Sequence, residues 1–212
     1  MADFKIDVIK IGMIYDLKMM SNIYETLVTH AANIPIILDP VLYSSTGQEL
    51  LKVDTQLFNY LKSKFIPFSH IITPNIIETE KICQIKIANL DDMVMGAQIL
   101  KSMGANIILL KGGHIDSNII HDVLLTDKLL KIYESDRINT NNTHGSGCSL
   151  ASAIAAKLAH KIPLERAITE ARSYVYNAIR NAIKPGKGNG TLNHYISPSP
   201  GGEGRDEGKI LS

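Results

Sequence analysis

A glycine-rich stretch, Asn142–Cys148, has the clearest chemical potential in the chain. It reads NTHGSGC and leads directly into an Ala- and Leu-rich segment that favours a helix. Gly145 and Gly147, with Ser146 between them, let the backbone approach an anion closely, and the N–H groups at a helix start favour phosphate. The pattern predicts an anion cradle; a plain connector before a helix is the alternative. It is not a P-loop, because the chain contains no GxxxxGK[ST].

Cys148 falls in the first turn of that predicted helix. The positive end of the helix dipole is expected to lower the pKa of the thiol, which would make it a proton acceptor or a nucleophile. The alternative is a small buried residue that packs the helix, a common fate of a free cysteine.

Oxygen ligands follow two apolar runs. Asp39 comes directly after Ile36–Leu38, and Asn75 and Glu78 come shortly after His70–Thr73. Because Asn75 and Glu78 are one helical turn apart, both can face one point, where oxygen ligands would suit Mg²⁺ held largely through water and phosphate. The alternative is that Asp39 starts a turn and that Asn75 caps a helix with Glu78 as its N3 partner, in a capping box.

A cation and two glycines end a further apolar run, Ile107–Lys111. Lys111 followed by Gly112 and Gly113 suits a nucleotide phosphate, and a solvated turn is the alternative. Met13 follows another apolar run and could wall a flat apolar ligand, although methionine also fills gaps in cores.

The apolar runs that precede these residues lack polar alternation, as expected for strands covered on both faces. Helical segments lie between them, so the pattern is βαβα. We therefore predict an α/β fold with a mainly parallel sheet between helices, and ligands beyond the carboxyl ends of its strands. The predicted strands are Val8–Ile11, Ile36–Leu38, His70–Thr73 and Ile107–Lys111, and the predicted helices are Ser21–Ala32, Asp54 to about Phe65, and Asn89 to just before Gly104.

The second half of the chain adds a hairpin and two helices. His121–Thr126 and Leu129–Glu134 flank the turn pair Asp127-Lys128, and Pro163 suits the first turn of a last helix that runs to about Ile183. We expect one domain over residues 1–196. Residues 197–212 are rich in Ser, Pro, Gly and charge and are expected to be a disordered tail.

Composition excludes several classes of protein. The 212 residues carry 22 Lys and Arg against 21 Asp and Glu, so the net charge of +1 gives no broad basic field for nucleic acid or an anionic membrane. Two cysteines are too few for a disulfide framework, and no apolar run reaches the ~20 residues that span a bilayer. We expect a cytoplasmic protein with a small-molecule ligand.

The order of the motifs is more specific than any one of them. From Val8 to Tyr195 the chain resembles the hydroxymethylpyrimidine/phosphomethylpyrimidine kinases of thiamine biosynthesis, which have the ribokinase-like fold. The cysteine of THGSGC, where sugar kinases of that superfamily carry aspartate, is the most discriminating match. The resemblance implies ATP-dependent phosphorylation of hydroxymethylpyrimidine and then of its monophosphate, with ATP and Mg²⁺ as cofactors. The matching segments are KIGM, DPVLYSSTGQELL, TPNIIETE, LLKGGH, NTNNTHGSGCSLASAIAA and GKGNGTLNHY.

The resemblance also implies a role for each matched residue. Cys148 would activate the substrate hydroxyl; Gly145, Ser146 and Gly147 would form the anion hole; Asp39 and Glu78 would organise Mg²⁺ and the ATP phosphates; Lys111, Gly113 and Asn75 would lie on the nucleotide side; Met13 and Val41 would line the pyrimidine pocket.

The chain departs from the family before KIGM, where members normally carry a first strand, a glycine-rich loop and part of the substrate pocket. We therefore expect an N-terminally truncated kinase, with a neighbouring strand edge exposed. Its expected partners are the pyrimidine substrate and either a second copy in a homodimer or a complementing N-terminal segment. A pyridoxal kinase of the same superfamily and a catalytically inactive kinase fragment are the alternatives, and the cysteine of GSGC favours the pyrimidine kinase.

Overall fold

The computed structural model describes residues 3–41, 55–184, 186–188 and 190–195, together with the backbone of residues 209–210. Strands and helices alternate through the first half, as the βαβα pattern predicts. The strands are β1 (Ile9–Ile11), β2 (Ile36–Leu38), β3 (Ile71–Ile72), β4 (Ile107–Lys111), β5 (Ile119–Leu125), β6 (Leu130–Asp136) and β7 (Lys209–Ile210). The helices are α1 (Leu17–His30), α2 (Thr55–Tyr60), a π-helical turn (Leu61–Phe65), α3 (Ile66–Phe68), α4 (Ile76–Cys83), α5 (Leu90–Ser102), α6 (Ser146–Ala159) and α7 (Leu164–Arg180).

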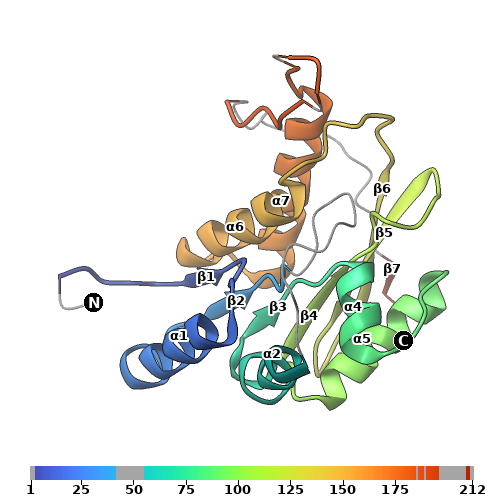
Figure 1. Ribbon diagram of the computed structural model, residues 1–212. Coiled ribbons are helices and arrows are strands. Elements are labelled where there is room, and N and C mark those ends of the chain that lie inside the picture. The colour runs from blue at the N-terminus through green and yellow to red at the C-terminus, as the bar shows by residue number, and fades with distance from the viewer. Residues whose placement is uncertain (1–2, 42–54, 185, 189, 196–208, 211–212) are drawn as a thin grey trace.

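Over the described residues the strands form one sheet whose spatial order follows the chain, from β1 at one edge to β7 at the other. The pairs from β1 to β4 are parallel, and those from β4 to β7 are antiparallel. The sheet is therefore mixed: the predicted parallel part ends at β4, and the predicted hairpin continues it (Figure 1). The carboxyl ends of β1 to β4 consequently lie along the same edge.

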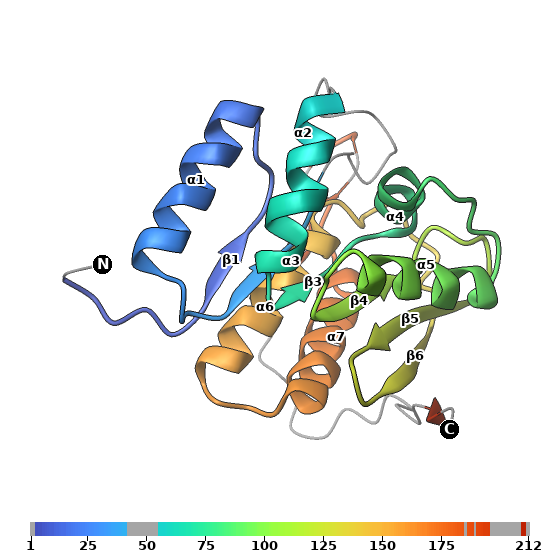
Figure 2. The ribbon, with the colours of Figure 1, turned by 90° about the horizontal axis from the view of Figure 1, so that it is seen from below.

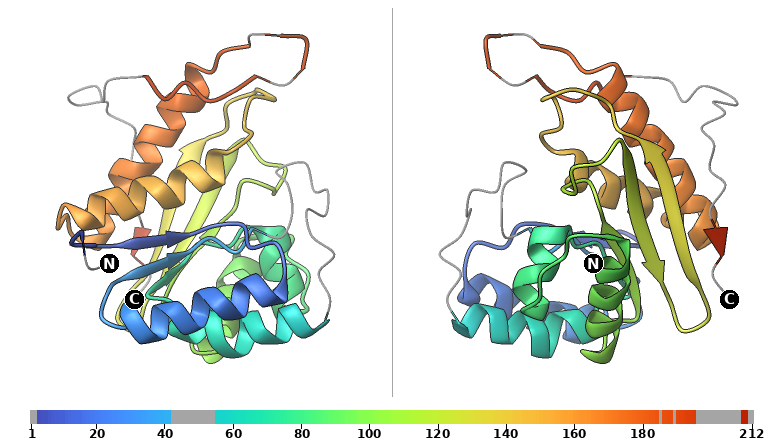
Figure 3. Two further views of the ribbon diagram at one scale, coloured as in Figure 1. Left: turned by 60° about the vertical axis from the view of Figure 1, so that its left-hand side comes forward. Right: turned by 90° about the vertical axis from the view of Figure 1, so that its right-hand side faces the viewer.

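Helices cover both faces of the sheet. Figures 1 and 3 show α1, α2, α4 and α5 on one face, with α6 and α7 on the other, and Figure 2 shows the first group in front. The side chains of β2 alternate between these layers, because Ile36 and Leu38 pack into the core under the first group and Ile37 into the core under α6 and α7. Both faces are apolar, which explains why the strand sequences show no polar alternation.

Side-chain caps set the starts of several helices. Asn89 caps α5 as predicted, through its side-chain oxygen and the N–H of Asp92. α1 begins at Leu17, four residues before the predicted start, because Asp16 accepts a hydrogen bond from the N–H of Met19. The predicted cap Asp54 lies outside the described residues.

The last helix and the C-terminal segment differ in detail from the expectations. Pro163 precedes the first residue of α7, which ends at Arg180 rather than near Ile183. Lys209 and Ile210, in the segment expected to be a disordered tail, pair with β6, and the expectation for the tail stays a prediction. The outer edge of β6 offers unpaired N–H and C=O groups, to which an extended segment can pair. The other residues of the tail lie outside the described residues.

Among the described residues there is no helix both long and apolar enough to span a bilayer.

Candidate active site

A cluster of ionisable side chains lies at the carboxyl edge of the parallel strands. Asp39 directly follows β2, and Lys111 is the last residue of β4. The Nζ atom of Lys111 lies 2.9 Å from Oδ1 of Asp39, and Nζ of Lys10, from β1, lies 3.4 Å from Oδ2. The structure thus brings together a carboxylate and a cation that the sequence placed at the ends of separate strands.

Asp39 is the centre of this cluster. Its side chain is only 1% exposed, and Thr73 donates a second hydrogen bond to Oδ1 at 3.2 Å. Within the described residues Oδ2 has no hydrogen-bond partner and lies 3.4 Å from the Lys10 ammonium. Burial acts to raise the pKa of Asp39, but Lys111 and Lys10 outweigh it and hold the pKa below its ordinary value. Asp39 is therefore ionised at neutral pH.

Lys111 remains a cation despite its burial. Desolvation acts to lower its pKa, but the carboxylates of Asp39 and Glu78 more than compensate, and the net shift is upward. A permanent positive charge at this point can bind a phosphate group.

Sequence reasoning missed Lys10. The apolar pattern places it inside a predicted strand and assigns it no role, although a lysine in an apolar strand needs a partner if it is buried. Its side chain is 19% exposed, and the partner is Asp39. The signal was available in the KIGM motif: the charge of Lys10 had to be balanced by a carboxylate from a neighbouring strand.

The glycine-rich loop lies against Lys111. Gly145 precedes α6 with φ of 82°, a left-handed conformation that favours glycine. A Cβ atom on Gly147 would lie 3.1 Å from Nζ of Lys111, so a larger residue there would crowd the ammonium. The first N–H groups of α6, which begins at Ser146, have no partner within the helix and carry the positive end of its dipole. The loop and the lysine together form a positively charged surface that can bind an anion.

Cys148 is exposed and lies close enough to Asp39 for the carboxylate to affect its pKa, so it is not a buried packing residue. The expectation of a lowered thiol pKa is wrong in direction. Partial desolvation raises the pKa of Cys148, the Asp39 carboxylate raises it further, and these effects exceed the opposing influence of Lys10 and Lys111. Position at a helix start therefore does not decide the direction of this shift, because partial burial and the nearby carboxylate both disfavour the thiolate.

Asn75 and Glu78 form the capping box that was the alternative to a metal site. The side chain of Asn75 accepts from the N–H of Glu78 at 2.9 Å, and Oε2 of Glu78 accepts from the N–H of Asn75 at 2.8 Å. The cap does not remove them from the site: Asn75 forms a backbone bridge with Lys111, and the charge of Glu78 acts on that lysine. A structural and a chemical role coincide at these residues.

The assignment of Met13 and Val41 to a pyrimidine pocket stays a prediction. Val41 borders a hollow of only about 10 Å³, which is too small for a pyrimidine ring, and Met13 is exposed and does not line it. Residues 42–54, which continue from Val41, lie outside the described residues. Gly113, two residues after Lys111, is exposed, and no atom of the described residues lies within 4 Å of the point that a Cβ would occupy there.

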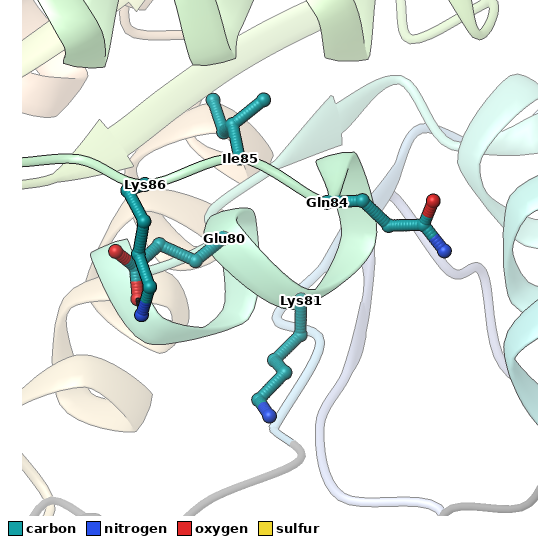
Figure 4. A pocket seen from close by; sticks show the side chains of 5 residues that line it. All are labelled: Glu80, Lys81, Gln84, Ile85 and Lys86. Atoms are coloured by element: carbon teal, nitrogen blue, oxygen red, sulfur yellow. Dashed lines mark ion pairs between the residues drawn. The ribbon is translucent and has the colours of Figure 1, made fainter.

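A larger cavity of about 330 Å³ lies elsewhere, at the C-terminal end of α4, the opposite end from Asn75 (Figure 4). Charged and polar side chains form most of its rim, and none of the predicted site residues lines it. Its lining residues are Glu80, Lys81, Gln84, Ile85 and Lys86.

The comparisons with known proteins match this arrangement to one family. The family model described as phosphomethylpyrimidine kinase matches residues 1–193. The chain belongs to the phosphomethylpyrimidine kinase family. A hydroxymethylpyrimidine/phosphomethylpyrimidine kinase of Aquifex aeolicus is 38% identical over 186 residues, which cover 88% of this chain and 72% of that protein. The thiamine biosynthesis bifunctional protein ThiED of Geobacter sulfurreducens is 35% identical over 196 residues, 92% of this chain but 39% of its own length.

Solved structures agree with the assignment to the phosphomethylpyrimidine kinase family. A phosphomethylpyrimidine kinase from Clostridium difficile superposes with a TM-score of 0.72 at 33% identity, covering 84% of this chain and 71% of that one. A Staphylococcus aureus pyridoxal kinase in complex with AMP-PCP gives a TM-score of 0.83 at 24% identity, covering 97% and 73%. The second likeness concerns the fold alone, and together the two confirm the ribokinase-like fold.

Proposed function

We propose that this chain uses ATP to phosphorylate hydroxymethylpyrimidine and then hydroxymethylpyrimidine monophosphate. Family membership supports the reaction class. The observation that carries the proposal is the contact of Lys111 with Asp39, with the Gly147 backbone beside the same ammonium. Phosphoryl transfer is mainly positioning and charge stabilisation, and this cluster supplies both. Because the reaction consumes ATP, we also propose a cytoplasmic location.

The position of each residue at the site indicates its role in the proposed reaction. The backbone at Gly145, Ser146 and Gly147 would hold the transferred phosphoryl group, through the N–H groups of the two glycines because that of Ser146 donates to the carbonyl of Thr143 at 3.1 Å. Lys111 would bind the ATP phosphates on one side of the transferred phosphoryl group. Cys148, next to the anion loop and within the electrostatic influence of Asp39, would orient and activate the substrate hydroxyl.

The carboxylates fit a Mg²⁺ site of the water-rich kind. Within the described residues no three His, Cys, Asp or Glu side chains form a metal cage. Magnesium in kinases is held by one or two carboxylates plus phosphates, and Oδ2 of Asp39 lacks a hydrogen-bond partner. Asp39 and Glu78 would hold the ion, which when bound would neutralise charge on the ATP phosphates.

The β1 edge supports a partner for the active enzyme. Among the described strands β1 pairs only with β2, so one side of its backbone is open. Large apolar side chains are exposed nearby, among them Phe4, Met13 and Tyr15. We propose that this face is covered in the active assembly by a complementing segment, and a homodimer is the other candidate.

The sequence relatives favour the pyrimidine over pyridoxal as substrate. The relatives above 30% identity described above are named for pyrimidine or thiamine biosynthesis, whereas the pyridoxal kinase with AMP-PCP is 24% identical and bears on the fold. Pyridoxal kinase activity and an inactive kinase fragment are therefore outcomes for the experiment to separate.

The test is formation of ADP with MgATP and each of three acceptors: hydroxymethylpyrimidine, its monophosphate and pyridoxal. The chain is assayed alone and with the part of the Aquifex aeolicus kinase that the match leaves out, and Lys111→Met is the inactive control. Turnover of the pyrimidines in either condition, abolished in the control, supports the proposal. Turnover of pyridoxal alone would reassign the substrate, and ATP binding without any turnover would identify an inactive fragment.

A further inference from the structure

A buried carboxylate outside the Asp39 cluster contacts the backbone directly after Lys111. Asp122, in β5, has a side chain 11% exposed and uses both of its oxygens. Oδ1 accepts a hydrogen bond from the N–H of Gly112 at 2.9 Å, and Oδ2 accepts from Nε of Arg172, in α7, at 2.9 Å. Neither Asp122 nor Arg172 has a role predicted from the sequence.

Arg172 is also buried and has several contacts. Its side chain is 8% exposed, and its guanidinium lies 5.1 Å from the centre of the Tyr133 ring. It also reaches the hydroxyl of Ser135 at 3.4 Å. The cation therefore comes from a helix on one face of the sheet and fixes a carboxylate that points to the end of β4.

Gly112 transmits this contact to the site because it is bonded to Lys111. The N–H of Lys111 donates to the carbonyl of Pro74 at 2.9 Å, and in the β4–β5 register Lys111 faces Asp122. The backbone at Gly112 leaves no room for a side chain, because a Cβ atom there would lie 1.9 Å from the carbonyl oxygen of His121. The backbone that carries the Lys111 ammonium is thus fixed on both sides.

A stability role alone explains this pair poorly. A buried ion pair often contributes no more to stability than apolar residues of similar volume, because desolvation of both charges offsets their attraction. A carboxylate is, however, well suited to hold one particular N–H group, since hydrogen bonds to a charged acceptor are stronger and more directional.

We propose that Asp122 is a positioning residue for nucleotide binding, which acts through the N–H of Gly112 to hold Lys111 and the Gly112–Gly113 backbone against the ATP phosphates. Arg172 orients the carboxylate through the hydrogen bond from its Nε to Oδ2. This inference rests on the proposed function, because it assigns ATP to the same edge of the sheet.

The experiment compares two double variants that differ in one hydrogen-bond acceptor. Asp122→Asn with Arg172→Met keeps an oxygen for the Gly112 N–H, and Asp122→Leu with Arg172→Met removes it at similar volume; neither leaves a buried charge without its partner. MgATP affinity is measured by calorimetry on the full chain, with the melting temperature and the exchange rate of the Gly112 amide.

We expect the asparagine variant to bind MgATP nearly as the parent does, and the leucine variant to bind roughly tenfold more weakly, the loss expected for one strong hydrogen bond. The Gly112 amide should exchange faster only in the leucine variant. Equal MgATP affinities in the two double variants, or affinities that simply follow the melting temperatures, would overturn the inference while leaving the proposed function intact. Absence of MgATP binding by the parent chain would instead reject the proposed function, and the inference with it.

Discussion

Lys111 and Asp39 are 72 positions apart in the chain, yet Nζ of the lysine lies 2.9 Å from Oδ1 of the aspartate. The contact spans the end of β3, because Lys111 ends β4 and Asp39 follows β2. Both side chains are largely buried, at 13% and 1% exposure. The same ion pair therefore contributes both to the stability of the sheet edge and to the charge of the site.

Replacement of Lys111 should therefore destabilise the protein. In Lys111→Met the Asp39 carboxylate stays buried and keeps only Lys10 as a counter-charge, so we expect a loss of about 1–3 kcal/mol in the free energy of unfolding. Lys10→Met is the matched control and should cost less, because that ammonium is farther away, at 3.4 Å. Urea denaturation measures both, and a larger loss for Lys10→Met would contradict the assignment of Lys111 as the main partner.

Acid should weaken the same pair. The pKa of Asp39 is lower in the folded protein than its ordinary value of 3.8, so the folded state binds this proton less readily than the unfolded state. The stabilisation from ionised Asp39 is then complete above about pH 4 and is lost as the pH falls through the folded pKa. Asp39→Asn removes this dependence. Melting temperatures of the two proteins should therefore converge as the pH is lowered below 3.8, and a constant difference would show that Asp39 does not titrate in this way.

The reactivity of Cys148 reports on its neighbour. The Asp39 carboxylate contributes to the raised pKa of the Cys148 thiol, whereas Lys10 and Lys111 act in the opposite direction. Asp39→Asn should lower that pKa and make alkylation by iodoacetamide at neutral pH several times faster, because the thiolate is the reacting form.

The alkylation is measured in Cys83→Ala protein, in a buffer free of divalent cations, so that a single thiol reacts. Burial raises the pKa of Cys83 to about 11, and its contribution is therefore small even where it is retained. An unchanged rate in the Asp39→Asn variant would mean that the carboxylate does not govern the thiol.

The strand pattern and the convergence of its carboxyl ends could be predicted because they depend on local apolar runs and on a general rule of parallel sheets. β2 and β4 have the predicted bounds, and Asp39 and Lys111 meet where that rule places them. The start of α1 was missed because the capping aspartate, Asp16, lies before the periodic apolar residues.

The electrostatics of the site could not be predicted in the same way. The direction of the Cys148 pKa shift depends on burial in the folded protein and on the proximity of Asp39, more than a hundred positions away, and no local pattern contains either. The role of Asp122 likewise depends on Arg172, fifty positions away in a helix on one face of the sheet. Sequence reasoning finds which residues reach an edge, but the pairs they form there depend on packing.

The two glycines after Lys111 should respond differently to alanine. In Gly112→Ala the new Cβ would lie 1.9 Å from the carbonyl oxygen of His121, so the backbone must move and we expect a loss of about 1–3 kcal/mol. In Gly113→Ala nothing lies within 4 Å of the new atom, and the stability should change by less than about 0.5 kcal/mol. Chemical denaturation of both variants measures the difference, and equal losses would contradict the close packing behind Gly112.

Two asparagine caps separate a structural from a nucleotide role. Asn75 caps α4 and Asn89 caps α5 with the same side-chain geometry, so each change to alanine should cost about 1 kcal/mol of stability. Only Asn75 forms a backbone bridge with Lys111 and shares its capping box with Glu78, whose charge acts on that lysine. Asn75→Ala keeps the backbone N–H that binds the Glu78 carboxylate but removes the acceptor for the Glu78 N–H, so the first turn that carries this carboxylate should loosen. MgATP binding should therefore weaken by roughly three- to tenfold, whereas Asn89→Ala should leave it unchanged. Calorimetric titration of both variants decides the matter: equal MgATP affinities would leave Asn75 as a helix cap and remove it from the nucleotide side of the site.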